Sequence, residues 1–171
     1  AFTQLFMILS PSDRIIKGLL SWMMGSLAGA RWDNLFVPTI GVLICSLIFL
    51  FLSGAFNVIS LGDETAISLG VNIHKIKKTT IILTALITGI LVSSCGIIGF
   101  VGFVIPHIIR LLIGSDHRKL FPLCFLMGGL FLIWMDILAR TVLAPQEVPI
   151  GIFTSLCGGP FFIWLLKRQM K

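Results

Sequence analysis

The chain has 171 residues, of which 57% are hydrophobic and only 12% are charged, and its mean hydropathy is +1.06. Soluble domains carry about 25% charged residues and disordered chains are poor in apolar ones, so this composition excludes both classes. The net charge of +6 arises from short basic clusters between long apolar runs, which is typical of an integral membrane protein rather than of a nucleic-acid-binding one.

The apolar runs predict an all-α, multi-pass membrane protein. A helix needs about 20 apolar residues to cross a bilayer. By this measure we expect spanning helices over residues 34–55, 78–97, 119–140 and 148–166, with a shorter helix over 102–112. The first ten residues are expected to end an earlier helix of a longer polypeptide. The predicted architecture is therefore a polytopic transmembrane bundle that includes short, broken helices.

A short helix is expected between Pro11 and Asn34. Apolar residues recur there at helical spacing, and Asp13 suits the positive end of a helix dipole. Gly25 and Gly29 weaken the end of this helix. We expect it to pack near the outer surface of the membrane, and the alternative is a plain amphipathic helix that lies in the membrane interface.

Basic residues set the predicted orientation, because cytoplasmic loops are enriched in Lys and Arg. Most of the thirteen basic residues lie in three clusters: Lys75, Lys77 and Lys78; Arg110, Arg118 and Lys119; and Lys167, Arg168 and Lys171. All three clusters face the cytoplasm only if the short segment over 102–112 crosses back. The spans over 34–55, 102–112 and 148–166 then run inward, and those over 78–97 and 119–140 run outward.

The uncharged run from Thr79 to Ile109 is too long for one span and too short for two. Its second half contains four residues that should interrupt the helix: Gly96, Gly99, Gly102 and Pro106. Small residues also allow backbones to approach closely. An irregular backbone within a membrane is tolerated only inside protein or along a cavity, so this stretch points to a transport pathway.

The polar loop over residues 61–71 predicts a short helix at the cytoplasmic surface. Asp63 and Glu64 favour its positive end, and Gly70 provides a stop at its carboxyl end. Its small apolar face consists of Ala66, Ile67 and Leu69. An apolar face that is not needed for spanning favours docking into the groove of a partner. The alternative is a surface helix that lies against its own membrane domain.

No catalytic residue and no metal site are expected. The sequence contains no nucleotide-hydrolysis, serine-hydrolase or zinc-protease motif and no CxxC pair. The four cysteines each lie in an apolar run and are interpreted as buried free thiols: Cys45, Cys95, Cys124 and Cys157. His107 is interpreted as an interior histidine rather than a metal ligand, because no Cys, Asp or Glu lies near it at ligand spacing.

Two features near the carboxyl end have local explanations. Asp136 and Arg140 are four residues apart, so they share a helix face and are expected to pair. Arg140 would lie at the outer end of its helix, where a partner could also reach it. Glu147 and Pro149 indicate the start of the last helix, and Gly-Gly-Pro over 158–160 predicts a kink in it.

The order of these motifs resembles the membrane permeases of ABC importers for iron–siderophore complexes, haem and cobalamin, often called FecCD-type. The matching residues are Trp22-Met23-Met24-Gly25-Ser26-Leu27; Leu61-Gly62 with Glu64, Ala66 and Leu69-Gly70; Gly96 to Gly102 with Pro106-His107, Arg110, Gly114 and Asp116-His117-Arg118; and Asp136 with Ala139-Arg140, Glu147 with Pro149 and Gly151, and Gly158 with Pro160 to Leu166. Gly159 stands where the family commonly has Ala. The resemblance covers almost the whole chain but only the carboxyl-terminal half of such a permease.

The resemblance implies a type II importer permease in the cytoplasmic membrane of a bacterium or archaeon. Residues 1–171 would form a single transmembrane permease domain, and two copies of the permease would enclose a central pathway. Cytoplasmic ABC ATPases would use ATP and Mg²⁺, and a periplasmic or lipid-anchored binding protein would deliver a metal chelate. This chain itself would bind no cofactor. A ferric siderophore is the expected substrate, with haem, cobalamin and molybdate as alternatives.

The resemblance also implies roles for individual residues. Residues 56–74 would form the cytoplasmic coupling-helix loop, with the ATPase contacted by Asp63, Glu64, Ala66, Leu69 and Gly70. The helix around Trp22 to Leu27 would help to form the outer gate. The expected gate and pathway residues are Trp22, Met23, Gly25, Ser26, Gly96, Gly99, Gly102 and Pro106. Arg140 would dock the binding protein. The competing hypotheses are a membrane-embedded enzyme and a non-functional or accessory membrane fragment.

Overall fold

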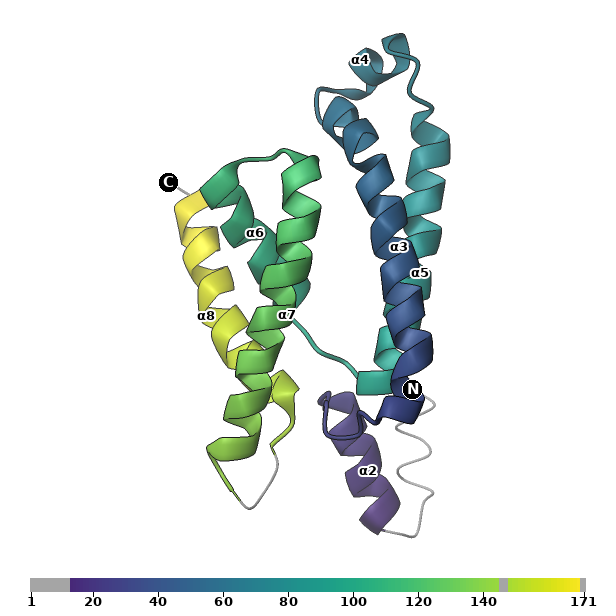
Figure 1. The fold of residues 1–171 in the computed structure, drawn as a ribbon. Helices are drawn as coiled ribbons and strands as arrows, with labels where there is room; N and C mark the ends of the chain where they lie inside the picture. Colours follow the sequence, from purple (N-terminus) through teal and green to yellow (C-terminus); the bar gives the residue numbers. More distant parts are fainter. Residues whose placement is uncertain (1–12, 145–147, 170–171) are drawn as a thin grey trace.

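Helices make up most of the chain, and no strand occurs in residues 13–144 and 148–169, the part that the computed structural model describes (Figure 1). In chain order the helices are α2 (Asp13–Met23), α3 (Trp32–Ile59), α4 (Asp63–Ser68), α5 (Ile73–Cys95), α6 (Val101–Ile113), α7 (His117–Thr141) and α8 (Ile150–Gln169). The all-α prediction is confirmed.

In the described part of the chain, four helices are long and apolar enough to cross a membrane: α3, α5, α7 and α8. They coincide with the four predicted spans. The helix α5 begins earlier than predicted because the side chain of Asn72 caps it, accepting a hydrogen bond from the Lys75 N–H at 3.0 Å. The helix α6 has 13 residues and is about 20 Å long, so it does not span a bilayer core of about 30 Å by itself.

The helices form two groups (Figure 1). Antiparallel α3 and α5 make a hairpin, with α4 across the connection between them, and α6, α7 and α8 make the second group. The chain passes from one group to the other through residues 96–100, which leave the end of the α3–α5 hairpin opposite α4. The helix α3 also packs against α7, and this contact joins the two groups.

The predicted basic clusters gather at one end of the molecule, here called the α4 end (Figure 1). The helix α4, the turn between α6 and α7 and the carboxyl end of α8 all lie there. The helix α2 and the carboxyl end of α7 lie at the other end, the α2 end. Lys171 is outside the described residues. The short helix α6 therefore does return the chain to the α4 end, as the distribution of Lys and Arg predicted.

Few large apolar side chains are buried. A small core between α6 and α7 contains Ile105, Ile109 and Leu120, with Phe131 against it. In contrast, large apolar side chains are exposed on every long helix, and Phe51 is 81% exposed. Contiguous exposed apolar surface indicates contact with lipid or with other protein, as expected for membrane spans.

The break between α5 and α6 is narrower than predicted. It comprises Gly96–Phe100, and positive φ angles of 72° at Gly96 and 66° at Phe100 mark its ends. Gly102 and Pro106 were expected to interrupt the helix, but they lie inside α6. Neighbouring helices and local adjustment of the backbone satisfy the groups that Pro frees in a membrane helix, so the helix continues through Pro106.

The last helix also continues through glycine and proline. The helix α8 is unbroken across Gly158, Gly159 and Pro160, and it begins at Ile150, directly after Pro149. Glu147 lies outside the described residues, as do the first ten residues that were expected to end an earlier helix. The cysteine prediction was partly wrong, because Cys45 is buried but Cys157 is exposed.

Candidate functional site

The short helix α4 has the ends that the sequence predicted. It begins at Asp63, directly after Gly62 with its φ of +116°. At its carboxyl end Gly70 adopts a φ of +78°, and its N–H donates to the Ile67 carbonyl at 2.9 Å. The Val71 N–H donates to the Ala66 carbonyl at 2.9 Å. These two bonds form a Schellman motif, in which the αL glycine ends the helix.

The residues of α4 divide into an inward and an outward set. Ala66 is completely buried, so its small side chain allows α4 to lie close to the rest of the protein. Leu61, Ile67 and Leu69 are more than 60% exposed, and Glu64 is exposed as well. Of the five predicted coupling residues, Asp63, Glu64, Leu69 and Gly70 are therefore at the surface. Ile67 and Leu61 were not among the predicted coupling residues, although both are apolar residues in a polar loop.

An ion pair ties α4 to α5. The Lys77 ammonium donates to Asp63 Oδ2 at 3.2 Å, and both side chains are about 60% exposed. Exposed pairs of this kind contribute about 0–1 kcal/mol, so the pair fixes the orientation of α4 more than it stabilises the fold.

At the α2 end, three glycines allow main chains from three segments to meet. The Ser26 N–H donates to the Cys95 carbonyl at 2.8 Å. A β-carbon on Gly25 would lie 2.5 Å from the Ile97 carbonyl oxygen, and one on Gly96 would overlap the Trp22 carbonyl. Only glycine permits these approaches.

The third of these glycines is Gly151, in the first turn of α8. A β-carbon there would overlap the carbonyl of Met24. We call Gly25, Gly96 and Gly151, with the Trp22 and Met24 carbonyls, the glycine junction. A β-carbon on Gly158 would overlap the Phe100 ring. Gly151 and Gly158 both belong to the motifs of the family resemblance, but nothing in the sequence indicated these close contacts.

The glycine junction corrects one prediction about the gate. A helix was expected to continue from Trp22 to Leu27, but α2 ends at Met23. Gly25 has a φ of +72°, which reverses the chain toward α5. Trp22 and Met23 are therefore helical, whereas Gly25 and Ser26 lie in a turn.

Of the other predicted pathway residues, Gly99 lies beside the glycine junction, whereas Gly102 and Pro106 lie apart from it. Gly99 lines a cavity of about 570 Å³ together with Met23, Met24, Gly151 and four α8 or linker side chains. Gly102 and Pro106 line a different cavity, of about 210 Å³, with Phe103, His107 and Arg110. No atom lies within 4 Å of the position that a β-carbon would take on Gly99 or Gly102. Close packing therefore requires glycine at Gly96 but not at these two positions.

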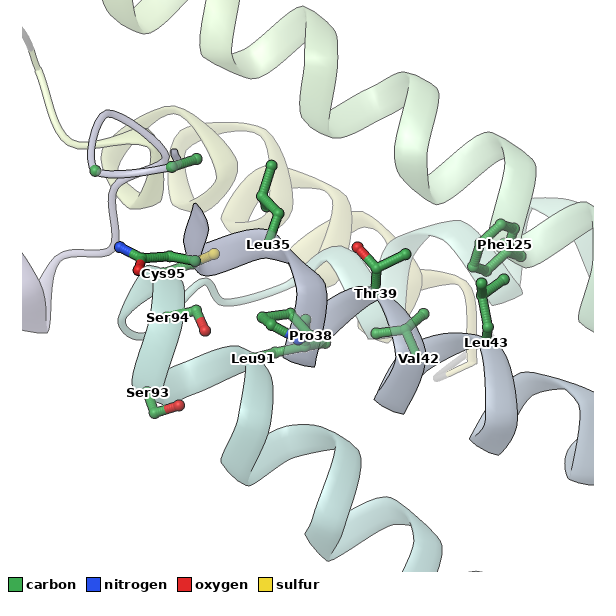
Figure 2. Close-up of a pocket in the computed structure, with 13 residues that line it drawn as sticks. Leu35, Pro38, Thr39, Val42, Leu43, Leu91, Ser93, Ser94, Cys95 and Phe125 are labelled. Carbon is green, nitrogen blue, oxygen red and sulfur yellow. The ribbon is translucent and has the colours of Figure 1, made fainter. Parts of the chain in front are cut away.

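A further cavity, of about 530 Å³, lies between α3 and α5 near the α2 end. Figure 2 shows its labelled lining side chains, which come from α3, α5 and α7. The lining is mostly apolar, with polar groups from Asn34, Thr39, Ser93 and Ser94. None of the predicted gate or pathway residues lines it.

Asp136 and Arg140 form the predicted ion pair. The Arg140 Nε–H donates to Asp136 Oδ2 at 2.8 Å. The pair lies in the last turns of α7, at the α2 end, and the Arg140 side chain is 48% exposed. About half of the Arg140 side chain is therefore accessible at this end of the bundle.

The titratable side chains do not form a metal site in the described part of the chain. Within residues 13–144 and 148–169, no group of three or more His, Cys, Asp or Glu side chains is placed to hold a metal ion. The His107 ring packs against aromatic rings instead, with centroids 6.4 Å from Phe103 and 5.9 Å from Phe161.

Comparison with known proteins gives a consistent result. The family model of the FecCD transport family matches residues 1–168. The chain is 43% identical over 159 residues to the hemin transport system permease protein HmuU of Yersinia pestis, covering 93% of this chain and 48% of that protein. It is 39% identical over 158 residues to the cobalamin import system permease protein BtuC of Halobacterium salinarum, covering 92% of this chain and 42% of that one.

A solved structure has the same fold. It is described as an inward-facing conformation of a metal-chelate type ABC transporter, and it matches with a TM-score of 0.89 and 33% sequence identity. The match covers 98% of this chain and 54% of the other. The chain thus spans about half the length of the curated relatives that it matches.

Proposed function

The chain belongs to the FecCD transport family, and on this premise we propose that it forms half of a permease subunit in an ATP-driven importer of a metal chelate. In this proposal residues 1–171 are one transmembrane domain. Two permease copies enclose the pathway, and separate ABC ATPase subunits bind ATP and Mg²⁺. The chain itself carries out no chemistry: its helices alternate between states that open the pathway to either side of the membrane.

The exposed apolar surface of α4 is the main observation that supports this proposal. A short helix outside the membrane spans exposes Ile67 and Leu69, and the neighbouring Leu61 extends this apolar surface. Exposed apolar side chains beyond the bilayer are not covered by lipid, so another protein is their natural cover. A short helix with one apolar face fits a groove on such a partner.

Charge supports the cytoplasmic placement of this surface. Lys77, Arg118 and Arg168 each belong to a basic cluster at the α4 end, and the cytoplasmic side of a membrane protein is the basic side. The α4 end would then face the compartment that holds ATP. Residues 56–74 are the proposed coupling loop, with contacts to the ATPase from Glu64, Ile67 and Leu69.

The α2 end would face outward and form the gate. The glycine junction brings the α2 turn, the end of α5 and the start of α8 together, so a small rotation of any one of them has to move the others. Arg140 lies at the same end and is the proposed docking position for an acidic residue of a substrate-binding protein.

The proposed substrate class rests on the names of the relatives and not on a binding pocket in this chain. The two relatives compared above are named for hemin and for cobalamin, and both compounds are metal chelates. We propose a metal chelate. The candidates to be tested are haem, cobalamin and the ferric siderophore that the family resemblance implies, and the oxyanion molybdate is the alternative outside this class. Uptake of each labelled compound, in competition with the others, by cells that carry the complete transporter identifies the substrate.

The decisive experiment tests whether α4 binds an ATPase. Ile67→Asp places a charge on the exposed apolar surface, and Ile67→Leu is the matched control that keeps it apolar. We expect the Asp variant to insert normally but to lose both ATPase co-purification and ATP-dependent uptake, while the Leu variant keeps both. Normal ATPase binding and uptake in the Asp variant would refute the proposed role of α4.

A further inference from the structure

A polar cluster connects the two helical groups at the α4 end. Asn57, in the last turn of α3, donates from Nδ2 to Asp116 Oδ1 at 2.7 Å. The Oδ1 atom of Asn57 accepts from the His117 N–H at 2.8 Å and lies 2.8 Å from His117 Nδ1. We call Asn57, Asp116 and His117 the polar node. Both ends of the Asn57 amide are bonded, so its orientation is fixed.

Asp116 has a second partner within its own segment. It caps α7, because Oδ1 also accepts from the Arg118 N–H at 3.0 Å. Hydrogen bonds from Asn57 and from the Arg118 main chain hold the pKa of the Asp116 carboxyl below its ordinary value. The carboxylate is therefore ionised at neutral pH, and charge-assisted hydrogen bonds of this kind are stronger than neutral ones.

Aromatic rings flank the polar node on both helices. The His117 ring packs against both Phe56 of α3 and Phe121 of α7, with centroids 5.8 Å and 5.7 Å away. Phe56 and Phe121 themselves meet edge to face at 5.7 Å. Hydrogen bonds with apolar groups on one side are strengthened by the low local dielectric.

The polar node lies where movement of α4 can pass from one helical group to the other. Asn57 lies just before the end of α3, and α4 follows after a short turn. The helix α4 packs against α3 and α5, whereas the segment broken at Gly96–Phe100 leads into α6, which packs against α7 and α8. The contact between α3 and α7 is therefore a route from α4 to α6 at the α4 end, separate from the route through α5 and the glycine junction at the α2 end.

We propose that Asn57 is a positioning residue that makes α3 and α7 move as one unit, so that displacement of α4 by an ATPase moves α6, α7 and α8. This inference rests on the proposed function. It assigns to Asn57 a role in coupling, beyond its contribution to folding, and it predicts that the contact between α3 and α7 stays closed throughout the transport cycle.

Charge exchange at the polar node tests the role of Asn57. Asn57→Asp faces the Asp116 carboxylate with a second one, so the donor is lost and like charges repel. Asp116→Asn alone is the matched control, because its amide oxygen can still accept from both Asn57 and the Arg118 N–H. The double variant Asn57→Asp/Asp116→Asn restores a donor opposite an acceptor.

The readout is substrate taken up per ATP hydrolysed by the complete transporter in proteoliposomes. For Asn57→Asp we expect a fall of about fivefold or more, the lower range for coupling between two sites, with ATPase co-purification unchanged. Asp116→Asn should remain near the wild-type ratio, and the double variant should recover it. An unchanged ratio in Asn57→Asp, or no recovery in the double variant, overturns the proposal.

A covalent tether gives a second test that does not depend on the folding of Asn57→Asp. Cysteines replace Phe56 and Phe121 in a background without the native cysteines, and a short bifunctional thiol reagent joins them. We expect the tethered transporter to keep the uptake per ATP that it has before tethering. Loss of transport on tethering would show that α3 and α7 separate, and would overturn the proposal.

Two controls distinguish a failure of this inference from a failure of the proposed function. They are the wild-type transporter and the Ile67→Asp variant. If the wild type takes up no chelate with ATP, or if Ile67→Asp is fully active, the proposed function itself fails. If both behave as expected and only the variants of the polar node do not, the role of Asn57 alone is wrong.

Discussion

Gly151, in the first turn of α8, lies so close to the main-chain carbonyl of Met24 that a β-carbon at position 151 would overlap the carbonyl oxygen. These two residues are far apart in the sequence, and their contact holds the start of α8 against the turn that follows α2. Gly96 makes an equivalent contact with the Trp22 carbonyl. Because of these two contacts, the segments at the α2 end pack through their main chains rather than through side chains.

The first prediction is that Gly151→Ala destabilises the protein. The added methyl group has backbone, not a flexible side chain, in its way, and overpacking of this kind costs about 1–3 kcal/mol. Gly159→Ala is the matched control in the same helix, because nothing lies within 4 Å of the position of its β-carbon. The midpoint of thermal unfolding in detergent should fall for Gly151→Ala only, and equal midpoints for the two variants would contradict the contact.

The second prediction concerns the carboxyl end of α4. Gly70 has a φ of +78° and open space around it, so a side chain is opposed by backbone conformation alone. Gly70→Val should cost about 1–2 kcal/mol locally and distort α4. Gly70→Asn is the control, because Asn tolerates the left-handed region. In the complete transporter, substrate-stimulated ATPase activity and uptake should fall for Val and largely persist for Asn; normal uptake with Val would argue against α4 as the coupling element.

The third prediction concerns orientation. Single cysteines are placed at Lys77, Arg118 and Arg31 in a background without the native cysteines, which is needed because Cys157 is exposed. An impermeant thiol reagent added outside intact cells should label the cysteine at Arg31 and spare the other two, since Lys77 and Arg118 lie at the α4 end. Labelling at Arg118 but not at Lys77 would mean that α6 does not return the chain to the cytoplasmic side.

The fourth prediction concerns the ion pair between Asp136 and Arg140. Arg140→Glu puts two carboxylates on one helix face, whereas Asp136→Arg/Arg140→Glu keeps the pair and reverses the charge at position 140. If Arg140 docks the binding protein, both variants should lose affinity for it, most strongly at low salt, because exposed charges act mainly on encounter and specificity. If the role of Arg140 is only structural, the binding protein should bind both variants normally, and only their stability should change. Affinity measured at two salt concentrations and thermal unfolding distinguish these outcomes.

The sequence by itself determined the features that depend on neighbouring residues. The four spans follow from the length and apolarity of each run, and the gathering of basic side chains at one end follows from where the runs stop. The ends of α4 were predictable too, because Asp63 starts a helix and Gly70 stops one through their own local chemistry. Pairing of Asp136 with Arg140 needed only the helical repeat.

Only the tertiary structure decided which residues meet across the bundle. Gly96, Gly99 and Gly102 have the same spacing and the same residue type, yet only Gly96 faces a carbonyl that excludes a β-carbon. Asn57 and Asp116 are 59 residues apart, and although Asp116 belongs to a motif of the family resemblance, nothing in either segment indicates their contact. The reason is that the register between two packed helices depends on all of their side chains together. A short stretch of sequence therefore does not indicate which residues will meet.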